Sequence, residues 1–264
     1  MVDHSSHRSE KARSRTVYII IAIVAVVAFT AVVAIAQLTS NNTKSSGEDS
    51  AQHGSSSAGS SADDSASKDS STPGEEGEWV RRDADDSAAI GNVDAPVVIT
   101  EWTDPRCPFC AHFHTEILPE LQKKYVDSGK VRFEFITVAF FGEQSAAAGA
   151  AMEAAGKQGK YSEYSDALYA AAPDKGHPDL PEETLVKFAE TAGVSDIERF
   201  RTDMNDSVLI DAVSSATAEA QQQYGIPAVP FFASSDGESA LRGAQPVENF
   251  SEFIDEQLEK AGVE

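Results

Sequence analysis

Two cysteines separated by two residues constrain this chain more than any other feature of its sequence. Cys107 and Cys110 are its only cysteines, in the stretch Cys-Pro-Phe-Cys. The apolar residues 96–102 before them predict a buried strand, and the helical spacing of apolar residues over 111–126 predicts a helix after them. At such a junction the helix dipole and the unpaired backbone N–H groups favour a thiolate at Cys107. A C-x-x-C motif in this setting indicates a redox site.

The residues alone leave a structural disulfide and a metal site open as alternatives for the cysteine pair. A structural disulfide across so short a loop would remove little chain entropy, so it would stabilise the fold weakly. A structural zinc site needs four ligands, and the sequence has no second cysteine pair. His112 and His114 are the nearest further candidates, and His114 shares a helix face with Cys110. A metal site of Cys107, Cys110 and His114 is therefore the stronger alternative, although we expect both histidines to lie on the helix surface.

The composition excludes one class of function. The formal net charge is -22 at pH 7 and no basic stripe is present, which argues against nucleic-acid binding. The hydrophobic content of 41% supports a globular core. With both cysteines in one motif, no separate disulfide framework holds that core together.

Three segments precede the globular sequence. Residues 1–16 are polar and basic and are expected in the cytoplasm, and residues 17–36 form an apolar run about as long as a membrane-spanning helix. The positive-inside rule places everything after this run outside the membrane. We predict an uncleaved signal-anchor, and cleavage after Ala36 is the alternative. Residues 37–78 are rich in Ser, Gly, Asp and Glu, so they predict a disordered linker.

Residues 79–264 predict one α/β domain with a helical insertion over about 142–224. Residues 88–96 are expected to be a loop, and 131–138 a second, central strand paired in parallel with the first. The helices expected in the insertion span 145–157, 160–172, 181 to Gly193, a helix capped by Ser195, and 206–223. A strand ending at Phe232, a hairpin turn at Asp236-Gly237 and a helix over 246–261 complete the pattern.

This order of features resembles the DsbA-like branch of the thioredoxin superfamily over nearly the whole globular sequence. Four matches carry the resemblance. They are the Cys-Pro-Phe-Cys motif at a helix start, Glu101 six residues before Cys107, Val229-Pro230, and the opening of the last helix over 243–247. The resemblance implies a thioredoxin fold with an all-helical insertion, preceded here by a single transmembrane helix and the linker.

Each residue near the cysteines has an expected role. Cys107 is expected to be the exposed nucleophile, because a stabilised thiolate both attacks and leaves well. Cys110, one turn into the helix, is expected to be the buried resolving cysteine. Glu101 lies on an apolar strand, where an ionised carboxylate is costly to bury. The resemblance makes it the proton acceptor for Cys110, and a solvent-facing acid is the alternative.

The resemblance also implies a peptide-binding site. In relatives a cis-proline, here Pro230, packs beside the disulfide, and the preceding residue, here Val229, pairs with an extended substrate by strand addition. Pro108 and Phe109 would contact the same peptide. Phe109 stands where well-known oxidising members carry a histidine, so a less oxidising couple is expected. The sequence identifies no partner for His177.

We therefore interpret the chain as a single-pass membrane protein with an extracytoplasmic thiol–disulfide oxidoreductase domain that donates disulfides to exported or cell-wall proteins. It would need no cofactor beyond the Cys107–Cys110 disulfide and would act as a monomer. By family analogy, a quinone-linked membrane enzyme of the DsbB or VKOR type would reoxidise it. The alternatives are a reductase or isomerase for one exported client and, in a different class, a Cys/His metal-binding or chaperone module.

Overall fold

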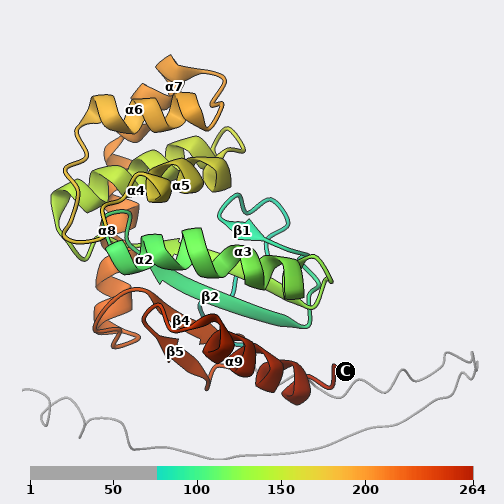
Figure 1. The fold of residues 1–264 in the computed structure, drawn as a ribbon. Coiled ribbons are helices and arrows are strands. Elements are labelled where there is room, and N and C mark those ends of the chain that lie inside the picture. Colours follow the sequence, from blue (N-terminus) through green and yellow to red (C-terminus); the bar gives the residue numbers. More distant parts are fainter. Residues whose placement is uncertain (1–75, 264) are drawn as a thin grey trace, which may run out of the picture. The chain divides into compact units, whose positions relative to one another are not determined.

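The computed structural model describes residues 76–263, so the expected cytoplasmic segment, the anchor and all but the end of the linker lie outside the described residues. Within residues 76–263, no helix is both long and apolar enough to cross a membrane. Five strands form one mixed sheet in the order β1-β3-β2-β4-β5. They are β1 (Ala89–Ile90), β2 (Val97–Thr103), β3 (Val131–Thr137), β4 (Phe231–Ser234) and β5 (Ala240–Arg242) (Figure 1).

The strand pairing confirms most of the expected topology. β2 and β3 pair in parallel, and β4 pairs antiparallel with the other side of β2 and with β5. Two expectations are wrong. The central strand is β2, not β3, and the segment 88–96 contains the short strand β1, which pairs antiparallel with β3. Every residue of β2 is buried, as expected for a mainly apolar and β-branched strand inside a sheet that is covered on both faces.

One long helix crosses a face of the sheet and carries both cysteines (Figure 1). It runs without a break through α2 (Pro108–His112), the π-helical turn η1 (Phe113–Ile117), α3 (Leu118–Leu121) and a second π-helical turn η2 (Gln122–Val126). Phe113 anchors it to the core, with ring centroids 4.6 Å from Phe232 of β4 and 5.1 Å from Phe250. Phe250 belongs to the C-terminal helix α9 (Val247–Lys260), so both helices cover the same face of the sheet.

The opposite face of the sheet is covered by an aromatic cluster. The ring centroid of Trp102 on β2 lies 5.8 Å from Trp79, 5.7 Å from Tyr224 and 5.9 Å from Phe231. Trp79 comes from the start of the domain and Tyr224 from the end of the insertion. The cluster therefore joins three distant parts of the sequence.

Five helices form the insertion. They are α4 (Glu143–Gly156), α5 (Tyr161–Ala170), α6 (Glu182–Thr191), α7 (Ile197–Met204) and α8 (Ser207–Gln222). In Figure 1, α4 to α7 are stacked on one side of the domain and β4, β5 and α9 lie on the other, while α8 runs down the left of the view from this stack toward β4. Small residues let α4 approach β3 and α8, since a Cβ on Gly149 would lie 2.8 Å from Thr137 and 3.0 Å from Val213. Ser195 does not cap α7. Asp196 does, because its carboxylate reaches the backbone N–H of Arg199.

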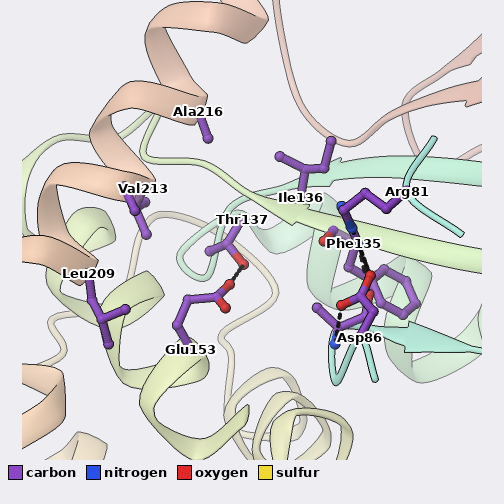
Figure 2. A pocket seen from close by; sticks show the side chains of 11 residues that line it. Arg81, Asp86, Phe135, Ile136, Thr137, Glu153, Leu209, Val213 and Ala216 are labelled. Carbon is purple, nitrogen blue, oxygen red and sulfur yellow. Dashed lines mark hydrogen bonds and ion pairs between the residues drawn. The ribbon is translucent and has the colours of Figure 1, made fainter. Parts of the chain in front are cut away.

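A pocket of about 340 Å³ lies where the insertion meets β3, and neither cysteine lines it. Arg81 and Asp86 form an ion pair of 2.7 Å at one side of this pocket. On the other side, the Thr137 hydroxyl donates to Glu153 of α4 at 3.1 Å (Figure 2). Burial raises the pKa of Glu153. The cysteines lie at a different cleft.

Candidate active site

The two cysteines lie where the central strand ends and the long helix begins. Cys107 is the N-cap residue of α2, its N–H donates to the carbonyl of Asp104 at 3.0 Å, and Pro108 occupies the first helical turn. Both cysteines are free thiols. Cys110 is buried as expected, but Cys107 is only 2% exposed, so the expectation of an exposed nucleophile is wrong. Residues distant in the sequence cover it, among them Val229, whose carbonyl lies 3.6 Å from the Cys107 sulfur.

The surroundings drive the acidities of the two thiols apart. A hydrogen bond from the Cys110 thiol, together with the N–H groups of Phe109 and Cys110 at the helix start, lowers the pKa of Cys107 despite burial. Burial, followed by the proximity of Cys107, raises the pKa of Cys110 well above its usual range. The pair is therefore arranged as a thiolate at Cys107 and a thiol at Cys110.

The predicted proline lies beside this pair. The Val229–Pro230 peptide bond is cis, the isomer that the family resemblance implies. Both residues are buried and lead directly into β4, whereas the two residues before them, Pro227 and Ala228, are exposed. The backbone approaching the cysteines is thus part of a loop that a ligand can reach.

An apolar cleft of about 480 Å³ opens beside Cys107. Besides Cys107 it is lined by Pro108, Phe109, Phe140, Phe141, Gly176, His177, Pro227, Ala228 and Val229. The predicted peptide-contacting residues are all among them. Phe109 is 64% exposed, so its ring presents an apolar surface at the edge of the cleft. Such a cleft next to a reactive sulfur suits an extended, mainly apolar peptide.

Arg106 and His177 hold one wall of this cleft together, and sequence reasoning missed both. His177 has partners after all: its ring stacks on Phe141 with centroids 3.7 Å apart, and Nδ1 lies 3.0 Å from the carbonyl of Arg106. The Arg106 guanidinium donates to the carbonyls of Pro178 at 2.7 Å and Phe141 at 3.0 Å. One arginine beside the cysteines therefore ties two loops of the insertion to the site.

Asp104 is a third missed residue, and it is fully buried. Its carboxylate accepts from the N–H of Arg106 at 2.8 Å and from the N–H of Phe141 at 3.3 Å. Burial raises its own pKa despite these hydrogen bonds. Its negative charge opposes the thiolate at Cys107, which acts to raise the pKa of that thiol. Its position at the end of a buried strand, three residues before the motif, was the available signal.

We expect Asp104→Asn to lower the pKa of Cys107, because the amide keeps an oxygen acceptor and removes the opposing charge. The measurement is the rate of alkylation of Cys107 by iodoacetamide between pH 4 and pH 9, which follows the thiolate fraction. The curve should move to lower pH. Asp174→Asn is the matched control, since Asp174 is an exposed acid on the far side of the Phe109 ring. A curve that moves to higher pH would contradict this account of Asp104.

Glu101 is buried in β2, which excludes the solvent-facing alternative. Its Oε2 lies 3.1 Å from Nε2 of His114. His114 was expected on the helix surface, and this expectation is wrong: it is 7% exposed and stacks on Tyr169 with centroids 4.4 Å apart. It lies in the π-helical turn η1, on the same buried face of the long helix as Cys110 and Phe113. His112, at the end of α2, is exposed as expected.

The metal alternative receives no support from the arrangement of these side chains. Among residues 76–263, no three His, Cys, Asp or Glu side chains are placed so that they could hold a metal ion.

The fold and the site together define a class of protein, one that exchanges thiols and disulfides through a C-x-x-C helix facing a cis-proline. A sequence model of the family described as thioredoxin matches residues 83–256. The chain belongs to the thioredoxin family, and within it to the DsbA-like thiol–disulfide oxidoreductases. The predicted family and the thioredoxin fold with a helical insertion are confirmed.

The names of several proteins similar to this chain refer to disulfide bond formation. The chain is 32% identical over 137 residues to the "Probable disulfide bond formation protein D" of Bacillus cereus, covering 51% of this chain and 63% of that protein. It is 27% identical over 175 residues to disulfide bond formation protein D of Bacillus subtilis, covering 65% of this chain and 75% of that protein. The crystal structure of oxidised BdbD from Bacillus subtilis has a TM-score of 0.60 at 25% identity, covering 65% of this chain and 92% of that one. The chain thus spans less than two thirds of the Bacillus cereus protein.

Proposed function

We propose that this protein is an extracytoplasmic thiol–disulfide oxidoreductase that introduces disulfides into exported or cell-wall proteins. The observation that carries the proposal is that the pKa values of two thiols within one helical turn shift in opposite directions: the pKa of Cys107 is lowered and that of Cys110 is raised. A low-pKa thiolate is a good leaving group, so its disulfide is readily given up to a substrate. The names of the Bacillus relatives point to the same activity.

The oxidised protein would carry the Cys107–Cys110 disulfide as its only redox group. A substrate thiolate attacks the Cys107 sulfur, forming a mixed disulfide, and the Cys110 sulfur leaves with the electron pair and takes up a proton. A second substrate thiolate then attacks the substrate sulfur of the mixed disulfide, and Cys107 leaves as a thiolate. The substrate loses two electrons, and the protein gains them as its reduced pair. Glu101, buried behind Cys110, is the proposed donor and acceptor of the Cys110 proton.

The substrate would lie along the apolar cleft in an extended conformation. Val229 is the residue proposed to pair with its backbone, because its carbonyl lies 3.6 Å from the Cys107 sulfur and next to the cis-proline Pro230. Main-chain hydrogen bonds depend little on sequence, so this mode suits many clients. Pro108 and Phe109 would contact the side chains that flank the substrate cysteine.

The proposed location follows from the N-terminal sequence. The apolar run 17–36, preceded by basic residues, supports a single membrane anchor with the redox domain outside the cell membrane. Oxidation of substrates is the net reaction expected in that compartment. A monomer reoxidised by a quinone-linked membrane enzyme of the DsbB or VKOR type completes the proposal, by analogy with the family.

The reduction potential of the full-length protein, equilibrated with glutathione buffers, tests the direction of this reaction. A potential well above that of the glutathione couple supports an oxidase. A potential near that of thioredoxin, about -270 mV, would overturn it in favour of a reductase or isomerase serving one exported client. Phe109 in place of a histidine is the feature that favours this second candidate.

We expect Phe109→His to raise the reduction potential, because a donor or cation at this position stabilises the Cys107 thiolate and hence the reduced form. About 30 mV corresponds to 1.4 kcal/mol for a two-electron couple, and a shift of roughly this size or more is expected. Phe109 is 64% exposed, so the fold should tolerate the change. Phe109→Leu is the control for lost ring contacts. An unchanged potential in Phe109→His would contradict the argument.

A further inference from the structure

Glu101 and His114 form a buried pair of titratable side chains, and the proposed function uses only the first. Oε2 of Glu101 lies 3.1 Å from Nε2 of His114, and their side chains are 0% and 4% exposed. Within residues 76–263, neither carboxylate oxygen of Glu101 nor Nε2 of His114 has a hydrogen-bond partner of good geometry. Polar groups left in this state are costly to bury. A pair retained at such a cost beside a reactive thiol is a candidate for function.

The local structure turns His114 toward the sheet and fixes its ring. The π-helical turn η1 (Phe113–Ile117), in which it lies, is a rare conformation that occurs frequently at functional sites. The imidazole stacks on Tyr169 at an interplanar angle of 23°. The Tyr169 hydroxyl in turn shares a hydrogen bond of 2.8 Å with Thr103. The ring therefore has one defined orientation beside Glu101.

A small cavity connects His114 with the surface. Its volume is about 130 Å³, room for a few water molecules at roughly 30 Å³ each. Polar side chains of Gln122, Ser162, Ser165 and Asp166 contribute to its lining. Ser162 and Asp166 are exposed, so the cavity reaches solvent at α5. His114 thus lies between a buried carboxylate and a polar space open to water.

The titratable groups around His114 come from two neighbouring elements and from its own helix. Strand β2 contributes Glu101, helix α5 contributes Tyr161, Asp166 and Tyr169, and its own helix contributes Cys110 one turn earlier. Strand β3 contributes only the apolar ring of Phe135. Among the described residues, no lysine or arginine lines the cavity or touches the ring. The imidazole carries two ring nitrogens, so it is the group here that can accept a proton at one atom and release a proton at the other.

We propose that His114 is a relay residue that passes the Cys110 proton between Glu101 and the water-accessible cavity. The inference deepens the proposed function and rests on it. During reoxidation the Cys107 thiolate attacks a disulfide oxidant, forming a mixed disulfide and releasing one thiolate. Cys110 then loses its proton to Glu101, Nε2 of His114 takes this proton on, and the other ring nitrogen releases it to water. The Cys110 thiolate attacks the Cys107 sulfur and displaces the second thiolate, so the oxidant gains two electrons.

The test follows these two steps separately in the reduced full-length protein with glutathione disulfide as the oxidant. Rapid acid quench and mass spectrometry measure two rates. The first is the rate at which the glutathione adduct forms on Cys107, and the second is the rate at which this adduct is lost when Cys110 attacks. In His114→Gln the first step should keep its rate, and the second should slow by about 10²-fold, the lower end for a general acid–base group. The pH profile of the second step should also change, whereas the loss of a purely structural contact would leave its shape unaltered. His112→Gln, at an exposed histidine of the same helix, is the matched control and should change neither step.

Chemical rescue separates proton transfer from structural support. In His114→Ala the shortened side chain leaves space beside the cavity, and added imidazole should restore the second step in a concentration-dependent way. A second step that keeps its rate and pH profile in His114→Gln overturns the relay. A slower second step that added imidazole does not restore, together with an unchanged pH profile, also overturns the relay. If both variants fail to fold, the solvent isotope effect on the native protein decides, since a second step with the same rate in water and in heavy water excludes a proton relay. Absence of any glutathione adduct on Cys107 would instead contradict the proposed function itself.

Discussion

Replacement of Cys107 by serine should reduce disulfide formation in a reduced substrate protein to the level seen without the enzyme, whereas Cys110→Ser should accumulate a mixed disulfide with the substrate. The difference follows from the acidities of the two thiols: the pKa of Cys107 is lowered, and that of Cys110 is raised well above its usual range. Of the two thiols, Cys107 is therefore the one that more readily presents a thiolate. Without Cys110, no internal thiol can release the substrate once it is bound to Cys107.

To detect trapping, each variant is mixed with a client that carries disulfides, so that the Cys107 thiolate attacks a client disulfide and displaces one client thiolate, and non-reducing electrophoresis shows the adduct. Disulfide formation in a reduced, unfolded client with glutathione disulfide as the oxidant measures turnover. Alkylation provides the control, because Cys107 should react with iodoacetamide at pH 6 in the native reduced protein and Cys110 should remain unmodified. The complete burial of Cys110 slows the reagent as well as raising the pKa of the thiol. A Cys107→Ser variant that still traps substrate, or preferential alkylation of Cys110, would reverse the assigned roles.

The strands and the cysteine helix were predictable because their patterns are local. A mainly apolar, β-branched run identifies β2, and a helical spacing identifies the helix after it. The family resemblance supplied what periodicity cannot, namely the place of Pro230 beside Cys107. The cis-proline itself follows from no local pattern, because nearly all peptide bonds before proline are trans in folded proteins.

The errors have physical causes that a linear pattern does not contain. Cys107 is buried because Val229 and His177, distant from it in the sequence, contribute to the walls around it. His114 lies on the helix face of Cys110, which the helical spacing indicated, but a polar side chain there is expected inside only when a buried partner such as Glu101 is known, and that contact is tertiary. Arg106 and Asp104 are short-loop residues whose partners lie in or next to the insertion. Their importance depends on tertiary contacts that bring the insertion back to the motif.

Trp102→Ala should cost about 3–5 kcal/mol of unfolding free energy, the usual range for removing a buried large aromatic side chain. Trp102 is 1% exposed on the central strand and touches Trp79, Tyr224 and Phe231. The change therefore leaves a cavity where the start of the domain, the end of the insertion and the sheet meet. Urea unfolding followed by circular dichroism measures the loss. Phe109→Ala is the control, because removing an exposed aromatic ring should change stability by no more than about 0.5 kcal/mol.

The same variant separates the stability of the fold from the chemistry of the site. Side chains alternate along a strand, so Trp102 and its neighbour Glu101 point to opposite faces of β2. Glu101 faces His114 and the cysteine helix, whereas Trp102 faces the aromatic cluster. Below its unfolding transition, Trp102→Ala should therefore keep the preference of iodoacetamide for Cys107 over Cys110. Loss of that preference while the far-ultraviolet spectrum stays native would show that the aromatic cluster, and not only the helix start, sets the acidity of the thiols.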